Sequence, residues 1–227
     1  MSIMDKKMSV RLAVLVFALL LVASGCSDDE ESPLTPAAVD NIPDSSLLFP
    51  DTPEQLMANF QKIYETMDLD EYRLILDPAF VTFLQEGTQD DFPEVGVALD
   101  VTEENHLHER MFLGEPLHDA NGDLLPAITQ FALARFQPVV DWGESLPTDP
   151  IPNTLSALYD VEILVDRGPE FSTLVVSGSI RFYVTTAEGR MNGEPKTYYR
   201  LVAQTDLTQG NKAVQLIPWG SLKAWFH

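Results

Sequence analysis

The sequence has few cysteines, few basic residues and few long apolar runs, and each shortage excludes a class of protein. Its 227 residues include one cysteine, Cys26, so no disulfide within a single chain can stabilise the fold. Lys and Arg number 14 against 35 acids, for a formal charge of −21. Nucleic-acid binding needs clustered Lys and Arg side chains that neutralise phosphates, and the chain has no such cluster. No nucleic acid is therefore expected as a partner.

Sequence motifs for common cofactors are also missing. The chain contains no P-loop, no Gly-rich dinucleotide turn and no EF-hand spacing, so we expect no cofactor. The pair Gly178-Ser179 lies inside an apolar, strand-like run and lacks the flanking glycines of a hydrolase nucleophile elbow. The acidity needs no specific ligand either, because surplus negative charge keeps a protein surface solvated and opposes self-association.

The one long apolar run lies near the N-terminus. Residues 12–23 contain no polar side chain, and Lys6, Lys7 and Arg11 precede them. A helix that spans the hydrocarbon core needs about 20 apolar residues, so this run is short for a permanent anchor. A basic start, a short apolar stretch and small residues after it are typical of a secretory signal peptide. We therefore predict that residues 1–25 are cleaved.

The sequence "ASGC", residues 23–26, resembles the lipobox of bacterial lipoprotein precursors, although Ala23 stands where leucine is usual. The resemblance implies that Cys26 becomes the first mature residue, carries lipid (palmitate or a related acyl chain) and anchors the protein in the cell envelope. Because Ser27 rather than aspartate follows, it also implies the outer membrane in a host with two membranes. Two or three acyl chains hold a protein stably, at about 0.8 kcal/mol per buried CH₂. In the alternative interpretation, Cys26 is only a small residue near a cleavage site.

Residues 26–50 are predicted to form an acidic, flexible tether. This stretch holds acids, prolines and serines but no base, and it shows no periodic apolar pattern. A flexible chain of this length spans about 25–30 Å, so the domain that follows could stand clear of the bilayer. The alternative is that the apolar residues within 45–49 dock on the domain as an N-terminal arm.

Two helices and a strand are predicted after the tether. Residues 52–67 carry apolar side chains three or four apart, and Thr52 is a suitable N-cap. Asp68 opens a shorter second helix that Asp77-Pro78 ends. A strand is predicted over residues 79–85.

A third helix is predicted after a polar loop. Residues 86–93 are rich in acids and turn formers and predict a loop. Asp100 and Glu103 have the spacing of a capping box. The helix they begin should place Leu107 and Met111 toward the core.

The second half of the sequence has the composition and alternation of β-strands. Strands are predicted over residues 128–140, 157–166, 173–186, 197–207 and 219–226. The alternation places Leu201 and Ala203 on one apolar face, while Gly178 marks a bend or bulge in its strand. Helices followed by a meandering sheet predict an α+β fold with N-terminal helices packed on a strongly curved, mainly antiparallel sheet.

The order of these elements resembles the nuclear transport factor two-like superfamily, which includes the SnoaL-like cyclases and the ketosteroid isomerases. The resemblance covers about residues 51–227 as a single cone-like domain and rests on "LDPAFVTFL" (76–84) and on a terminal hairpin formed by 200–209 and 219–226. It implies a pocket between the concave sheet and the helices. A cystatin-like sheet over a helix and a lipocalin-type barrel are the alternatives.

Acid–base chemistry in such a pocket would need a titratable group on the apolar face, and the predicted apolar faces supply none. Tyr64, Tyr159 and Tyr199 are the polar side chains expected to line a pocket, although a buried tyrosine is more often a core residue. We predict no catalytic residue.

The histidines are the other candidates for a site. His106, His108 and Glu109, with His118 beyond, invite a metal-site interpretation. On a helix, however, His106 and His108 point about 200° apart. They are therefore predicted to be surface residues that bind no metal.

Two functions are compatible with the sequence. The first is a membrane-tethered, extracytoplasmic binding or assembly module without catalysis, which would take an apolar small molecule or form a homodimer. The dimer surface would be a solvent-exposed outer face of the sheet that includes Arg181, Tyr183, Arg200 and Gln204. The second is an isomerase, dehydratase or cyclase with a substrate pocket inside the cone. A pocket with an inward carboxylate or histidine beside a tyrosine would favour the enzyme. A cone whose interior is filled by aromatic side chains would favour the binding module.

Overall fold

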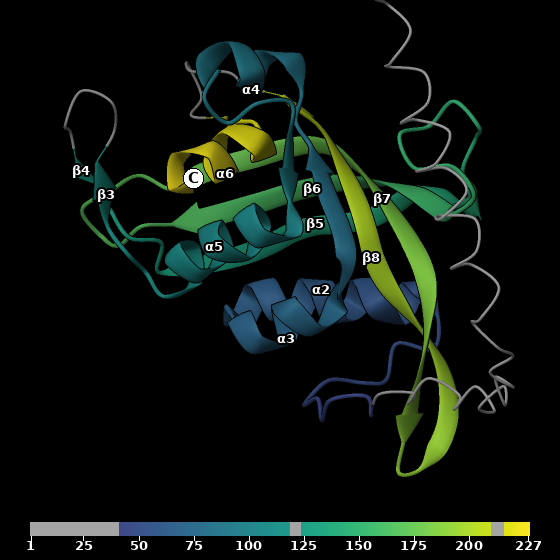
Figure 1. Ribbon diagram of the computed structural model, residues 1–227. Helices are drawn as coiled ribbons and strands as arrows, with labels where there is room; N and C mark the ends of the chain where they lie inside the picture. Colours follow the sequence, from purple (N-terminus) through teal and green to yellow (C-terminus); the bar gives the residue numbers. More distant parts are fainter. Residues whose placement is uncertain (1–40, 119–123, 210–215) are drawn as a thin grey trace, which may run out of the picture. The chain divides into compact units, whose positions relative to one another are not determined.

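The computed structural model describes residues 41–118, 124–209 and 216–227 (Figure 1). The predicted signal peptide, the lipid site at Cys26 and the first part of the tether lie outside these residues. The described chain forms an α+β fold with five helices and a six-stranded, mostly antiparallel sheet. This confirms the predicted fold class. None of the described helices has the length and apolar content needed to cross a membrane.

The main sheet runs in the order β2-β1-β8-β7-β6-β5. Its strands are β1 (Leu76–Phe83), β2 (Ala98–Asp100), β5 (Gln130–Glu144), β6 (Leu155–Asp166), β7 (Leu174–Met191) and β8 (Glu194–Gln209). All neighbouring pairs are antiparallel except β1 with β8. The long strands twist strongly, and the β7–β8 hairpin extends beyond the helices (Figure 1). A second, two-stranded sheet joins β3 (Leu117–His118) to β4 (Leu124–Leu125).

The first helices begin where the sequence predicts. The helices are α2 (Pro53–Thr66), α3 (Leu69–Ile75), α4 (Glu86–Asp91), α5 (Val101–Phe112) and α6 (Trp219–Phe226). The side chain of Thr52 caps α2 and that of Asp68 caps α3. Asp100 and Glu103 form the predicted capping box of α5, and Leu107 and Met111 are buried.

One predicted boundary and the predicted type of two elements are wrong. The strand predicted to start at Ala79 starts at Leu76, so Asp77 and Pro78 lie inside β1. Residues 86–91 form helix α4 instead of a loop. The strand predicted over residues 219–226 is helix α6, so no terminal hairpin follows β8.

Helix α6 receives its N-terminal cap from a distant strand. Pro218, its own N-cap residue, makes no side-chain capping bond. Instead, the amide of Gly220 donates to Asp206 Oδ2 (2.7 Å), and the amide of Trp219 donates to Thr208 Oγ1 (2.6 Å). A Cβ on Gly220 would lie 2.9 Å from Asp206 Oδ2, so this close approach requires glycine. The aromatic composition of residues 219–226 favours a strand. The groups that cap the helix lie outside these residues, in β8, so the local sequence does not reveal them.

A bulge in β8 exchanges the two faces of that strand. Leu201 and Ala203 pair with consecutive residues of β7, which leaves Val202 as an extra residue. Beyond the bulge every side chain points to the face opposite to the predicted one. Gln204 and Asp206 therefore point toward the core, where both are buried. The prediction that Gln204 lies on a solvent-exposed outer face is therefore wrong, whereas Ala203 is buried as predicted.

Gly178 does not mark a bulge, because its pairing with β6 is regular through that point. Its φ of 138° is a backbone conformation that only glycine adopts readily. The register shift of β7 with β8 occurs instead at Tyr183 and Val184.

Residues 41–50, which the sequence assigns to the end of the tether, lie against the domain. We call this segment the arm. The amide of Ile42 donates to the carbonyl of Arg190 in the β7–β8 hairpin (2.9 Å), and the amide of Tyr199 donates to the carbonyl of Pro50 (2.9 Å). The arm therefore docks on the domain, as in the alternative interpretation of residues 45–49.

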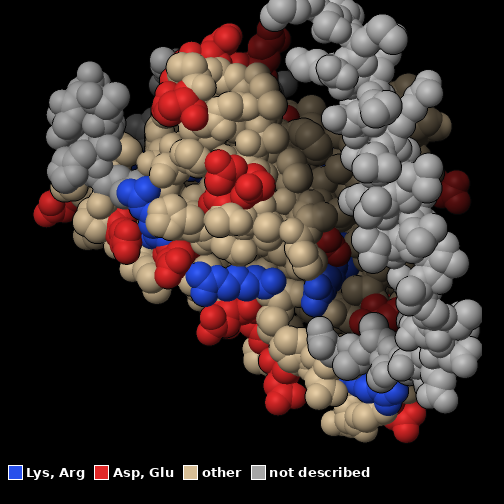
Figure 2. Space-filling view, in the orientation of Figure 1, with Lys and Arg blue, Asp and Glu red and all other residues tan. Residues whose placement is uncertain are grey.

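The core lies between the helices and the sheet. Helix α2 packs on β5, while α5 packs on β1 (Figure 1). The largest side chains with under 2% exposure include Trp219, Tyr64, Tyr72, Phe80, Phe131 and Phe182. Figure 2 shows acidic and basic groups interspersed on a mostly uncharged face.

Candidate functional site

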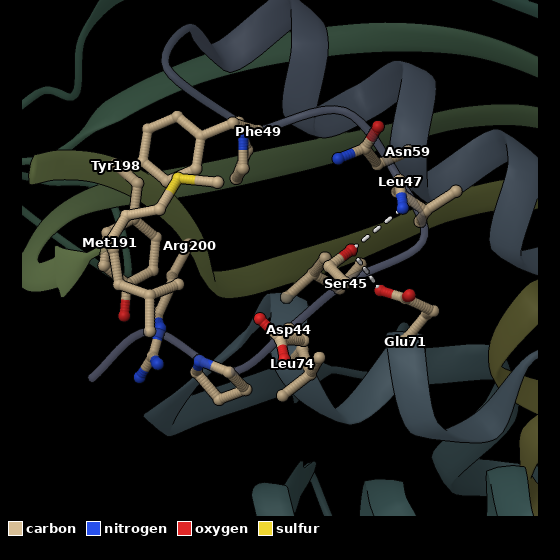
Figure 3. A pocket seen from close by; sticks show the side chains of 14 residues that line it. Asp44, Ser45, Leu47, Phe49, Asn59, Glu71, Leu74, Met191, Tyr198 and Arg200 are labelled. Carbon is tan, nitrogen blue, oxygen red and sulfur yellow. Dashed lines mark hydrogen bonds between the residues drawn. The ribbon is translucent and has the colours of Figure 1, made fainter. Parts of the chain in front are cut away.

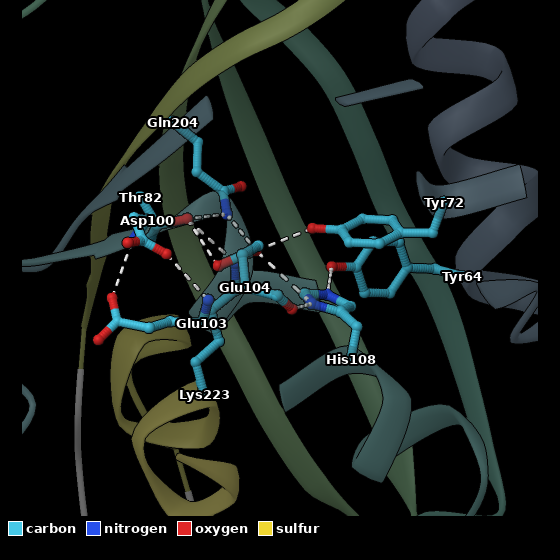
Figure 4. A network of polar contacts seen from close by, with 9 residues as sticks. All are labelled: Tyr64, Tyr72, Thr82, Asp100, Glu103, Glu104, His108, Gln204 and Lys223. Carbon is cyan, nitrogen blue, oxygen red and sulfur yellow. Dashed lines mark hydrogen bonds and ion pairs between the residues drawn. The ribbon is translucent and has the colours of Figure 1, made fainter. Parts of the chain in front are cut away.

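The core contains a cluster of polar side chains around the carboxylate of Glu104 (Figure 4). We call it the interior network, and its members are Tyr64, Tyr72, Thr82, Glu104, His108, Gln204 and Lys223, all at most 1% exposed. Tyr72 donates its hydroxyl to Glu104 Oε1 (2.8 Å), and Thr82 donates to Glu104 Oε2 (2.9 Å). These two hydrogen bonds join α5, which carries Glu104, to α3 and β1.

Lys223 on α6 forms a buried ion pair with Glu104. Burial alone would raise the pKa of Glu104, but the Lys223 charge and the donated hydrogen bonds hold that pKa below its usual value, so the carboxylate is ionised. Burial lowers the pKa of Lys223, an effect that the carboxylate opposes. Removing one partner of such a pair typically costs about 3–5 kcal/mol of stability, because the other charge stays buried.

His108 is a neutral imidazole with a defined tautomer. Its Nδ1 lies 2.8 Å from the backbone carbonyl of Glu104, which can only accept, so Nδ1 carries the proton. Its Nε2 then accepts from the hydroxyl of Tyr64. Burial lowers the pKa of His108 to about 3, because the Glu104 carboxylate opposes this effect without offsetting it and the Lys223 charge adds a smaller lowering. The 3.6 Å approach of His108 to Glu104 is therefore not an ion pair at neutral pH.

The two tyrosines complete the network. The ring of Tyr72 stacks on His108 with centroids 3.9 Å apart. Burial raises the pKa of Tyr64 and of Tyr72 well above 10, so both hydroxyls stay protonated donors. A carboxylate, an imidazole and two phenols are the group types of acid–base catalysis.

Aromatic side chains fill the space around the interior network. Tyr64 packs against Phe60 (4.6 Å between ring centroids), Phe112 (5.4 Å), Phe131 (5.5 Å) and Trp219 (5.6 Å). No member of the network lines the cavity beside the arm or the cavity beside Tyr199. In this state the groups interact with one another and are closed off from solvent.

The three tyrosines predicted to line a pocket lie in different surroundings. Tyr64 belongs to the interior network. Tyr159 is buried against Phe182 (5.5 Å) and Phe136 (4.9 Å), and burial raises its pKa to about 12. Tyr199 alone borders a cavity, a shallow one along β7 and β8 that Glu144 and Thr186 also line. A ligand role for these residues stays a prediction.

The sequence did not predict that Glu104, His108, Gln204 and Lys223 belong to a buried polar site. The prediction that His108 lies on the surface is wrong, since it is fully buried. A signal was available, because residues 104, 107, 108 and 111 have the spacing of one helical face. Leu107 and Met111 were predicted to be on that face, which also carries Glu104 and His108.

No group of three or more metal-ligating side chains gathers in the described part of the chain. His106 and His108 point in different directions on α5: His108 is buried, whereas His106 is exposed. This arrangement follows from their spacing on the helix.

A cavity of about 130 Å³ lies between the arm, α3 and the β7–β8 hairpin (Figure 3). We call it the arm cavity. Its apolar wall comprises Ile42, Pro43, Leu47, Phe49, Pro50, Leu74, Ile75, Met191 and Tyr198, and its polar groups are Asp44, Ser45, Asn59, Glu71 and Arg200. Phe49 from the arm lies 6.0 Å from Tyr198 of the hairpin, measured between ring centroids. The arm therefore supplies one wall of the cavity.

Glu71 on α3 fixes the arm over this cavity. Its carboxylate accepts from the hydroxyl of Ser45 (2.7 Å) and from the amide of Ser46 (2.5 Å). Burial would raise the pKa of Glu71, but these donors lower it below its usual value, so the carboxylate stays charged near neutral pH. On α2, Asn59 donates to the carbonyl of Leu48 (2.7 Å).

Comparisons with known proteins add little. No protein-family model matches the chain, and no curated protein matches it. Among solved structures it is similar to a protein of Novosphingobium aromaticivorans described as a "putative aromatic ring hydroxylase". The two are 15% identical over 67% of this chain and 82% of the other, with a TM-score of 0.39. These values are too low to assign a family or a function.

Proposed function

We propose that the protein is a lipid-anchored, extracytoplasmic lipoprotein whose domain binds a ligand and performs no catalysis. The observation that carries the binding role is the arm cavity, because it is open to a small molecule whereas the interior network is closed. The lipid anchor is supported by the apolar run at residues 12–23 and by the lipobox-like "ASGC" before Ser27. We further propose that residues 51–227 belong to the cone-like superfamily, on the support of capped helices lying over a twisted sheet.

Intact mass of the protein extracted from membranes tests the anchor. We expect the wild type to begin at Cys26 and to carry acyl mass, and we expect Cys26→Ala to lack that mass and to leave the membrane fraction. The matched control is Ser24→Ala, which keeps the cysteine and the small residues around it. If the wild-type chain carried no acyl mass, the proposed lipid anchor would be wrong.

The alternative function, an isomerase, dehydratase or cyclase acting inside the cone, is favoured by one observation. His108 accepts from Tyr64 beside an ionised carboxylate, and these are groups that an acid–base mechanism uses. The aromatic packing around it opposes this function, because a substrate would have to displace Phe112, Phe131 or Trp219.

Histidine modification by diethyl pyrocarbonate separates the two functions, because the reagent acylates accessible neutral imidazoles. We expect mass spectrometry to find His106 and His227 modified in the folded protein and His108 protected. Modification of His108 at a rate similar to that of His106 would show that the interior opens, and it would favour the enzyme.

A further inference from the structure

We propose that the arm cavity binds a small apolar carboxylate, a ring or short chain of about six carbon atoms whose carboxylate pairs with Arg200. This inference names the ligand class for the binding role proposed above and rests on it. Its basis is the lining of the cavity, the lack of an acid partner for Arg200 and the docking of the arm.

The size and lining of the cavity limit the ligand. A volume of about 130 Å³ is close to that of an engineered cavity of about 150 Å³ that holds benzene. Leu74 and Ile75 form one wall, while Phe49 and Tyr198 offer aromatic faces on which a ring can pack. A diacyl lipid is too large for this space.

Arg200 supplies the charge that selects the head group. Its guanidinium lies 5.1 Å from the centre of the Tyr198 ring, and no ion pair joins it to an acid within the described residues. Its Nε is buried and has no acceptor among those residues. A buried donor without an acceptor is uncommon in native proteins, and a carboxylate is the group that best matches a guanidinium. Figure 3 shows Arg200 beside Tyr198 and Met191.

The two carboxylates of the cavity set the position of the head group. Glu71 is occupied by Ser45 and Ser46 of the arm, so it is not available to a ligand cation. Asp44 is exposed, and it would repel an anion. The ligand carboxylate therefore lies at the Arg200 end, and its apolar part lies between the arm and α3.

Binding and docking of the arm are coupled, because the cavity exists only while residues 42–50 lie on the domain. A ligand in the cavity contacts both the arm and the hairpin and so stabilises the docked state. The amide of Tyr199, bonded to the carbonyl of Pro50, reports this state directly.

Titration calorimetry of the whole chain, in lipid nanodiscs if it is acylated, tests the proposal with three ligands of equal size. We expect benzoate to bind with a Kd on the order of 0.1–1 mM, as suits a ligand of this size, and benzyl alcohol and benzylamine to bind at least tenfold more weakly. Arg200→Gln should weaken benzoate at least tenfold, whereas Arg181→Gln should not. Asp44→Asn should strengthen it about two- to threefold.

A second variant and a second readout protect the test against misfolding. Leu74→Phe fills the cavity and should abolish benzoate binding while the denaturation midpoint stays near that of wild type. Benzoate should also slow hydrogen exchange at the Tyr199 amide in wild type and not in Leu74→Phe.

Several results would overturn the inference. Equal binding of benzoate and benzyl alcohol, tighter binding of benzylamine, an unchanged affinity in a folded Arg200→Gln variant, or no binding of benzoate at 10 mM would each do so. None of these results bears on the acyl mass at Cys26, so the anchor and the ligand class succeed or fail separately.

Discussion

At the scale of single residues, His108 couples the core to pH. The folded protein keeps this imidazole neutral down to a pKa of about 3, whereas an exposed histidine titrates near 6.5. Between these values the unfolded chain binds a proton that the folded chain does not. Stability therefore rises with pH through this window and falls as the pH drops.

We predict that the free energy of unfolding falls by up to about 1.4 kcal/mol per pH unit from pH 6.5 downward because of His108. His108→Asn should flatten this dependence between pH 6.5 and 5, above the range in which most carboxylates titrate. Urea denaturation at several pH values measures the slope. His106→Asn, at an exposed position of the same helix, is the matched control and should keep the wild-type slope. Equal slopes for wild type and His108→Asn would contradict the prediction.

Residue-level features were predictable from the sequence only where the signal is local. Thr52, Asp68 and Asp100 cap their helices as expected, because capping depends on residues two or three positions away. The inward position of Gln204 was not predictable, because it depends on one extra residue in β8 that breaks no composition rule.

At the scale of elements, α6 depends on groups that lie far from it in the sequence. Asp206 and Thr208 of β8 accept its first amides, and Glu104 of α5 pairs with its lysine. Burial raises the pKa of Asp206, which the donated hydrogen bonds oppose. The aromatic residues of 219–226 suit a strand by local preference, and these tertiary contacts override that preference.

We predict that Gly220→Ala destabilises the protein by about 1–3 kcal/mol. The new Cβ would lie 2.9 Å from Asp206 Oδ2 and 3.0 Å from Leu84 Cδ2, so the cap or the packing must shift. The control is Gly87→Ala in α4, where nothing lies within 4 Å of the position that the new methyl group would take. That change should be neutral or stabilising by up to about 1 kcal/mol. Chemical denaturation of both variants gives the comparison, and similar effects at the two sites would refute the role of the cap.

At the scale of the whole molecule, charge works against compactness. A formal charge of −21 on 227 residues makes the folded chain repel itself, and the unfolded chain relieves part of that repulsion by expanding. The ion pair between Glu104 and Lys223 in the core changes this balance little, since its two charges cancel.

We predict that raising NaCl from 0.1 M to 1 M raises the melting temperature, because the screening length falls from about 10 Å to about 3 Å. Calorimetry in a salt series measures the effect. A rise concentrated below about 0.3 M indicates screening of charge repulsion, whereas a rise that stays linear to 1 M would point to salt exclusion from the surface and contradict the prediction.

The order of contacts along the arm has a mechanical consequence. Tension applied to the chain before Asn41 enters the domain first at the bond between Ile42 and Arg190, then at Glu71, then at Asn59, and last at the bond between Pro50 and Tyr199. Because these bonds are loaded one after another rather than together, we expect the arm to detach at a lower force than the core needs to unfold. A pull along the chain would therefore remove the wall of the arm cavity before it disturbed α2.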